Sequence, residues 1–237
     1  MKRVIIVGAS SGMGRELALK YAKDGLQLGI TGRRESLLKE VQSLYPDNIL
    51  IRCFDCSAME NTIELEQLKD EMNGIDLLVL CAGTGEINKS LDFGLEKGTN
   101  TLNVQAFTEI CCWAFNYFKD KGAGHLVVIT SIAGIRGGRV APAYNASKAY
   151  QIHYLEGLRQ RAHRLKLPIH ITDIRPGFVD TAMAKGGGRF WVVPKEKASR
   201  QICNHIRKKS EVAYISKRWR LIAWLLKLLP PWVYKNF

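Results

Sequence analysis

The sequence predicts a single α/β domain built on a doubly wound parallel sheet of about seven strands, with helices on both faces. Short apolar runs rich in Val, Ile and Leu alternate along the chain with longer segments of helical period. A glycine-rich turn follows the first of these runs. Alternation of this kind predicts parallel strands joined by helical crossovers, whose carboxyl ends form one ligand-binding edge.

The N-terminal unit has the pattern of a strand, a glycine turn and a helix. Residues 3–7 form an apolar, β-branched run, which indicates a buried strand. The turn at residues 8–14 follows, and an amphipathic pattern continues to about Asp24. Backbone N–H groups in such a turn can approach a pyrophosphate at the helix N-terminus. The turn therefore predicts a dinucleotide phosphate site.

The second strand, expected at residues 27–31, ends in Gly32-Arg33-Arg34. An acidic residue at this position would bind the ribose hydroxyls of NAD, whereas arginine suits a 2′-phosphate because its planar fork binds bidentately. Arginine at a helix N-terminus is also poorly placed for the helix dipole, which favours a ligand-binding role for Arg33 and Arg34. The alternative is a pair of solvated arginines that begin a helix.

The alternation continues to the C-terminal quarter of the chain. Helices are expected at residues 35–44, 58–72, 99–119, 142–165 and 195–208, and strands at residues 49–54, 75–81, 125–130, 169–174 and 212–215. Residues 84–98 are expected to be less regular, and Arg175-Pro176-Gly177 to form a turn. The polar candidates fall just past strand ends, so one edge of the sheet collects them: Gly8, Arg33, Asp55, Gly83, Ser131 and Pro176.

Tyr144 and Lys148 stand four residues apart in a predicted helix that begins with Pro142, and therefore share one helix face. The pKa of a free tyrosine is about 10. A fixed ammonium favours the phenolate, so the pair predicts a tyrosine whose pKa is lowered toward neutrality. The alternative is a buried aromatic ring beside a solvated lysine.

These residues resemble the short-chain dehydrogenase/reductase family over nearly the whole chain. The similarity rests on Gly8-x-x-x-Gly12-x-Gly14, Cys81-Ala82-Gly83, Asn103, Ser131, Tyr144-x-x-x-Lys148 and Pro176-Gly177. The resemblance implies a Rossmann-type fold and an NADPH-dependent enzyme that interconverts a ketone and a secondary alcohol. A non-catalytic dinucleotide-binding scaffold is the alternative from another class, and the intact Asn103, Ser131, Tyr144 and Lys148 argue against it.

The resemblance also implies catalytic roles. Tyr144 would be the general acid in reduction and the base in oxidation, and Lys148 would lower its pKa and hold the nicotinamide ribose. Ser131 would hydrogen-bond the substrate oxygen, and Asn103 would hold a water that connects Lys148 to solvent. Hydride transfer to a carbonyl builds negative charge on oxygen, which hydroxyl donors stabilise.

The cofactor expected from the resemblance is NADP(H). The residues expected to bind it are Gly8, Ser10, Ser11, Gly12, Met13, Gly14, Arg33, Arg34, Asp55, Ala82, Gly83, Tyr144, Lys148, Pro176, Gly177, Val179 and Thr181. Asp55 would contact the adenine, and Val179 and Thr181 the carboxamide. Val7 and Cys81 depart from the usual threonine and asparagine of the family, which makes the cofactor pocket less typical.

The six cysteines form no secreted-style framework. Cys53 and Cys56 are spaced like half a zinc site, but no second pair follows, so no metal is predicted. Reduced thiols indicate a cytoplasmic protein. No signal peptide is found, and no apolar run approaches the roughly 20 residues that span a bilayer.

The net charge of +13 is concentrated near the C-terminus, because thirteen Lys or Arg and two acids follow from Lys185 onward. Basic surfaces serve nucleic acid, anionic lipid or phosphate ligands. No nucleic-acid-binding module is present in the sequence, so nucleic acid is not an expected partner. The expected partners are a small carbonyl or alcohol substrate and, by resemblance, further copies of the chain in a homodimer or homotetramer paired through helices 99–119 and 142–165.

Two segments lie outside the family pattern and bear on the substrate. Within the catalytic domain (residues 1–216), residues 182–193 contain three successive glycines followed by Phe190 and Trp191, as in a lid that closes on an apolar substrate; the alternative is a surface loop. Residues 217–237 form a basic amphipathic tail that Pro230-Pro231 interrupts.

Such a tail suits an interfacial position on anionic lipid, at the inner face of a membrane. The alternative is a helix packed on its own subunit or on a partner subunit. We therefore expect an apolar or lipid-like substrate, with a small hydroxy metabolite in solution as the alternative.

Overall fold

A seven-stranded parallel sheet lies at the centre of the protein, in a computed structural model that describes residues 2–58, 60–181 and 190–236. The strand order is β3-β2-β1-β4-β5-β6-β7. The strands are β1 (Arg3–Val7), β2 (Gln27–Gly32), β3 (Ile49–Cys53), β4 (Leu77–Leu80), β5 (Gly124–Ile129), β6 (Ile169–Pro176) and β7 (Val212–Ile215). Every neighbouring pair is parallel, which confirms the predicted fold class.

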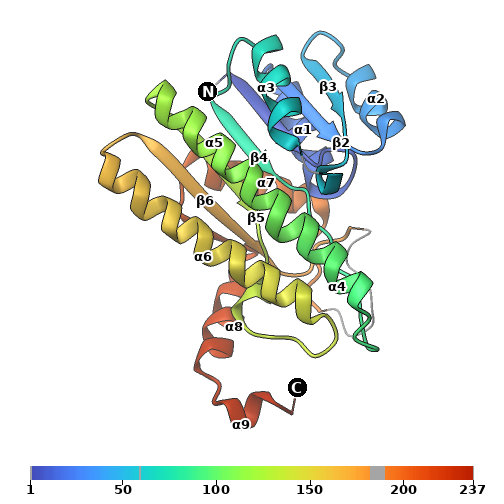
Figure 1. The fold of residues 1–237 in the computed structure, drawn as a ribbon, viewed down its shortest axis with the longest axis vertical. Helices are drawn as coiled ribbons and strands as arrows, with labels where there is room; N and C mark the ends of the chain where they lie inside the picture. Colours follow the sequence, from blue (N-terminus) through green and yellow to red (C-terminus); the bar gives the residue numbers. More distant parts are fainter. Residues whose placement is uncertain (1, 59, 182–189, 237) are drawn as a thin grey trace.

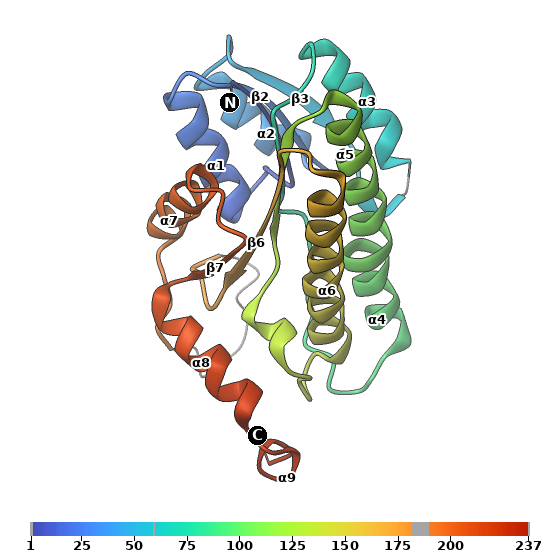
Figure 2. The same cartoon turned by 90° about the vertical axis from the view of Figure 1, so that its left-hand side faces the viewer.

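Helices cover both faces of this sheet (Figures 1 and 2). One face carries α1 (Gly12–Lys23), α2 (Glu35–Ser43) and α7 (Lys195–Arg207), and the other carries α3 (Asn61–Glu71), α5 (Phe107–Lys121) and α6 (Pro142–Leu165). Successive residues of a strand point to opposite faces, so Val4 and Ile6 join the first apolar core and Ile5 joins the second. This is why the strands read as continuous apolar runs.

The strand order reverses at β1, which pairs with β2 on one side and β4 on the other. Ligands of open α/β sheets bind in the crevice outside the carboxyl ends of the strands at such a switch point. The glycine turn after β1 and the Ala82-Gly83 pair after β4 both lie at this crevice. Topology therefore brings the predicted cofactor residues from distant parts of the sequence to one edge.

Three local predictions were wrong. The helix expected at residue 99 begins earlier, as α4 (Phe93–Asn100), because the Asp92 side chain accepts a hydrogen bond from Leu95 N (3.0 Å) and caps it. A π-helical segment (Thr101–Ala106) then joins α4 to α5. In the expected turn after residue 174, Arg175 and Pro176 instead extend β6, because Tyr214 and Ile215 of β7 pair with them.

The C-terminal tail forms α8 (Lys217–Leu228) and α9 (Pro231–Tyr234), which extend away from the sheet (Figure 2). One face of α8 packs on the body of its own subunit through the buried Trp219 and Ala223. At the far end, the Arg136 guanidinium donates to Leu229 O (3.2 Å), and the Tyr234 hydroxyl donates to the carbonyl of Gly137. No helix of the described residues is long and apolar enough to cross a bilayer.

Candidate active site

Ser131 and Tyr144 lie in contact beyond the end of β5. Ser131 caps a short 3₁₀ turn, where its Oγ accepts from Ala133 N at 3.1 Å. Tyr144 follows Pro142 by two residues in the first turn of α6, and it lies close enough to Ser131 for a side-chain hydrogen bond between them to lower its pKa. Two hydroxyl groups from different elements therefore face one point, as a site that holds a carbonyl oxygen requires.

Lys148 is buried, with 4% of its surface exposed. Its ammonium donates to Ile129 O (3.1 Å) and to Gln151 Oε1 (2.9 Å), and lies 5.9 Å from the centroid of the Tyr144 ring. The alternative of a solvated lysine is therefore wrong. A charge held away from water needs hydrogen-bond partners, and the Lys148 ammonium has two.

The electrostatics of the pair differ from the prediction. Burial raises the pKa of Tyr144, and the hydrogen bond from Ser131 opposes this only in part. Burial lowers the pKa of Lys148 to about 8, opposed by the negative charge of Asp173 and by Cys81. The predicted lowering of the Tyr144 pKa is thus wrong for the protein alone. Loss of water around the phenolate dominates, and the Lys148 ammonium is bonded to Ile129 and Gln151 instead.

Asn103 lies fully buried in the π-helical segment and fixes the neighbouring strand end. Its side chain donates to Thr84 O (2.7 Å) and Ser147 Oγ (3.0 Å) and accepts from Thr84 N (2.9 Å). Its own carbonyl accepts from Gln151 Nε2 at 2.8 Å. The wider π turn places this carbonyl toward α6, and π-helical turns are frequent at functional sites.

Gln151 therefore joins Lys148 to the backbone of Asn103, and the water by which Asn103 would connect Lys148 to solvent stays a prediction. The amide oxygen accepts from the lysine while the amide nitrogen donates to the Asn103 carbonyl. Sequence reasoning missed this residue. The available signal was its spacing, because a position three residues after Lys148 lies on the same helix face.

The glycine turn fits a phosphate-binding cradle. A Cβ on Gly8 would lie 2.6 Å from Ala82 N, and one on Gly14 would lie 2.2 Å from Gly8 O, so the close approach of β1, β4 and α1 requires glycine at both. At Gly12, whose φ is +58°, a Cβ would meet only the Thr181 side chain among the described residues, with Cγ2 nearest at 3.4 Å. The first turn of α1 contains no acidic residue, which leaves its N–H groups free of a competing anion.

Arg34 lies over this turn, and Arg33 lies beside the end of β3. The Arg34 guanidinium donates to Ser10 Oγ (2.9 Å) and Ser11 Oγ (2.7 Å). Arg33 is exposed and lies 3.9 Å from Asp55 Oδ2. The ends of β1, β2 and β3 thus meet around two cations. This arrangement suits a dinucleotide that carries an additional phosphate.

The remaining predicted cofactor residues divide into two groups. Gly83 adjoins the catalytic cluster, because a Cβ there would lie 3.3 Å from Asn103 Oδ1 and 3.5 Å from Lys148 Nζ. Gly177 is covered by Trp219, whose ring would lie 2.0 Å from a Cβ at that position. The side of Gly177 on which a Cβ would stand therefore faces Trp219 of α8, and its expected contact with the cofactor stays a prediction.

The segment after β6 is held by local contacts. Val179 is buried and forms a parallel bridge to Val193, and Pro176 is buried as the last residue of β6. Residues 182–189 of the expected lid lie outside the described residues. Its described end, Phe190 and Trp191, packs with Phe178 and Trp219 at centroid distances of 5.1–6.1 Å. Met13, in the first turn of α1, packs against the core.

Comparisons with known proteins agree with this geometry. A profile of the family described as short chain dehydrogenase matches residues 2–189. An uncharacterized oxidoreductase of Mycobacterium tuberculosis is 30% identical over 247 residues, which cover 100% of this chain and 97% of that protein.

Solved structures share the fold. A short-chain dehydrogenase from Sphingobium yanoikuyae in complex with NADPH gives a TM-score of 0.81 at 19% identity and covers 98% of this chain and 97% of that chain. A bulky-bulky ketone specific alcohol dehydrogenase from Comamonas testosteroni gives 0.79 at 20% identity, with 98% and 96% covered. The profile match and the full-length relative together show that the chain belongs to the short-chain dehydrogenase family of oxidoreductases.

Proposed function

We propose that this protein is an NADPH-dependent reductase that interconverts a ketone and a secondary alcohol on an apolar or lipid-like substrate. The observation that carries the proposal is the contact of Tyr144 with Ser131 beside the buried Lys148, whose ammonium donates two hydrogen bonds. These groups lie at the same sheet edge as the glycine turn. Bound NADP(H) would supply or accept the hydride there.

The side chains divide the chemistry between them. Ser131 and Tyr144 donate hydrogen bonds to the substrate oxygen, where negative charge develops during reduction, and Tyr144 transfers the proton. Lys148, with its pKa near 8, is largely charged at neutral pH and stabilises the tyrosinate that remains. Gln151 and Asn103 hold Lys148 in place through the amide link.

NADP(H) is favoured over NAD(H) by the cations at the glycine turn. Arg34 is fixed there by Ser10 and Ser11, and the end of β2 carries Gly32 where an acid would select NAD. NADPH should bind more tightly than NADH, and Arg33→Ala/Arg34→Ala should remove most of the difference while Lys39→Ala on α2 should keep it. Equal affinities in the wild-type protein would overturn the preference.

An apolar substrate is supported by the loops that flank Tyr144. The loop before α6 is tied to the loop before α4 by Asn88 N donating to Val140 O (2.7 Å), and the first turns of the two helices are tied by Ala143 N donating to Glu96 Oε2 (2.9 Å). Apolar side chains are exposed here: Phe93, the first residue of α4, is 78% exposed, and Val140, in the loop before α6, is 42% exposed. Exposed apolar residues of this kind next to a site mark a surface that binds apolar partners.

A panel of ketones and alcohols with NADPH and NADP tests the reaction. Long-chain keto compounds should give higher kcat/KM than small keto acids, and turnover should vanish in Tyr144→Phe. The control is Tyr150→Phe, on the same helix but bonded to Thr108 on the outer surface. Activity retained in Tyr144→Phe would exclude the proposed proton transfer, and a preference for small hydroxy metabolites would exclude the apolar substrate.

We further propose that α8 contacts the inner face of an anionic membrane. Leu221, Trp224, Leu225 and Leu228 follow the spacing of one helix face and are each 45–60% exposed, opposite the buried Trp219 and Ala223. Cations flank this apolar stripe, as on interfacial helices. Leu221→Glu/Trp224→Glu should abolish flotation with anionic liposomes, whereas Leu44→Glu, directly after α2 and equally exposed, should not. No flotation of the wild-type protein would exclude the contact.

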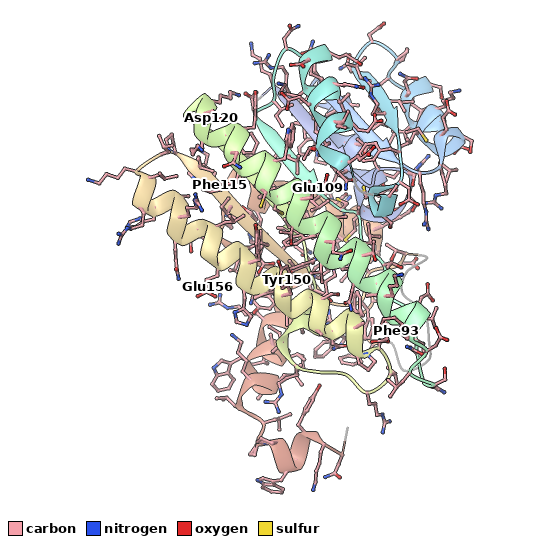
Figure 3. The ribbon with its side chains drawn as sticks, viewed as in Figure 1. Phe93, Glu109, Phe115, Asp120, Tyr150 and Glu156 are labelled. Atoms are coloured by element: carbon pink, nitrogen blue, oxygen red, sulfur yellow. The ribbon has the colours of Figure 1, made fainter. Side chains whose placement is uncertain are left out.

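A homodimer or homotetramer remains a proposal from family resemblance. The helices α5 and α6 lie side by side on one face of the molecule, where Figure 3 labels Glu109, Asp120, Tyr150 and Glu156. Light scattering coupled to size-exclusion chromatography tests the assembly. A monomer at micromolar concentration would contradict it.

A further inference from the structure

A groove of about 530 Å³ lies between α7, the β7–α8 junction and the segment before α7, away from Ser131 and Tyr144. Figure 2 shows α7 and α8 on the same side of the molecule with β7 between them. The lining residues are Trp191, Val192, Val193, Pro194, Lys197, Gln201, Asn204, His205, Lys208, Tyr214, Ser216, Lys217 and Arg218. None of the proposed catalytic or cofactor residues belongs to this set.

The charge of the groove is of one sign. Its lining contains Lys197, Lys208, Lys217 and Arg218 and no acidic residue. Within the described part of the chain, none of these four cations forms an ion pair. Elsewhere on the surface, lysines such as Lys39 and Lys121 pair with carboxylates. Like charges that converge without counter-charge repel one another, so a bound anion would relieve the repulsion.

The fields of these cations meet inside the groove. Lys208, which directly follows α7, and Lys217, the first residue of α8, both lower the pKa of His205, after the larger effect of burial. The two lysines come from different elements and act on one ring, so their convergence is a property of the fold. Gln201, Asn204, Tyr214 and Ser216 add neutral donors for the remaining oxygens of a polyoxygen anion.

The position of the groove indicates where the anion comes from. Lys217 and Arg218 open α8, and the exposed apolar stripe of that helix begins at Leu221, one turn later. A membrane that received the stripe would therefore place its headgroup layer next to the groove. Arg218 lies 5.7 Å from the Trp191 ring, so an aromatic side chain also stands at this boundary.

We infer that this groove binds the phosphate group of an anionic membrane lipid, with Lys208 and Lys217 as its main cationic contacts. The inference rests on the proposed membrane contact of α8 and adds to it a specific headgroup site. A second copy of the chain is a poorer occupant. A two-fold interface would bring the same cations of both copies together, which costs free energy.

Liposome flotation with NADPH present tests the site. Phosphatidylcholine vesicles are doped either with phosphatidic acid or, at equal surface charge, with a fatty acid, which presents carboxylate in place of phosphate. The wild-type protein should prefer the phosphate vesicles, and Lys208→Ala/Lys217→Ala should lose that preference by roughly fivefold per lysine, while Lys23→Ala/Lys97→Ala should retain it. An unchanged preference in the groove variant, or none in the wild type, would overturn the site.

A second measurement separates the two sources of phosphate and the two proposals. Inorganic phosphate, against chloride at matched ionic strength, should raise the Tm of the NADPH-saturated wild type and not that of the groove variant. If no vesicle binds but this shift occurs, the membrane contact of α8 and the lipid source are overturned while a phosphate site is retained. If neither occurs, the groove site is overturned as well.

Discussion

Gln151→Leu isolates the link between Lys148 and Asn103, because leucine has a similar size and no polar atoms. In the wild type, Gln151 supplies one of the two acceptors of the Lys148 ammonium. A hydrogen bond to a charged group contributes about 1.5–3 kcal/mol. One pH unit of pKa corresponds to about 1.36 kcal/mol, so loss of this acceptor should lower the pKa of Lys148 by at least about one unit.

The sign of the effect on activity follows from the direction of this change. Lys148 acts in its charged form, and its pKa in the wild type is about 8. With the acceptor removed, the lysine loses its proton at lower pH, so the fall of kcat/KM on the alkaline side should begin about one pH unit earlier. At pH 7.5 the charged fraction should drop roughly threefold.

The assay is the pH dependence of kcat/KM with saturating NADPH, measured beside the Tm of each variant. Gln160→Leu is the matched control, because Gln160 lies exposed on the same helix. In this control, the fall of kcat/KM on the alkaline side should begin at the same pH as in the wild type. If Gln151→Leu lowers the Tm but leaves this pH unchanged, Gln151 only supports packing and the proposed positioning of Lys148 is refuted.

Three further outcomes follow from buried contacts. Lys148→Met should abolish activity yet raise the unfolding free energy at pH 7 by about 3 kcal/mol, because the folded protein no longer holds a lysine whose pKa is lowered from 10.5 to about 8. Urea titration should show this gain vanishing as the pH rises through 8 toward 10.5, and a lower stability at pH 7 would contradict it. Gly177→Ala should lower the free energy of unfolding by about 1–3 kcal/mol, since its Cβ would overlap the Trp219 ring. Gly98→Ala is the control, because a Cβ there meets nothing within 4 Å and should not lower stability. Equal Tm values of the two variants in calorimetry would refute the contact. Glu96→Ala should lower kcat and reduce stability by about 1–3 kcal/mol, because the Ala143 amide loses its acceptor and the Asn88 side chain loses one of its two. Unchanged steady-state kinetics would show that the contacts of Glu96 do not position Tyr144.

The sequence by itself determined the elements that depend on periodicity and spacing. Apolar runs and amphipathic segments are local properties, so the parallel sheet, its strand number and most boundaries could be predicted. The Tyr144–Lys148 pair could be placed on one helix face because four residues make about one turn. The glycine turn could be recognised for a similar reason, since its three glycines lie within seven residues.

Only the tertiary structure decided the features that depend on burial or on residues far apart in the chain. Burial raises the pKa of Tyr144, against the prediction, because spacing cannot show how much water surrounds a side chain. The link from Lys148 through Gln151 to Asn103 requires the π-helical segment to pack against α6. The groove between α7 and α8 likewise exists only in the fold, because its cations come from two elements that folding brings to one cavity.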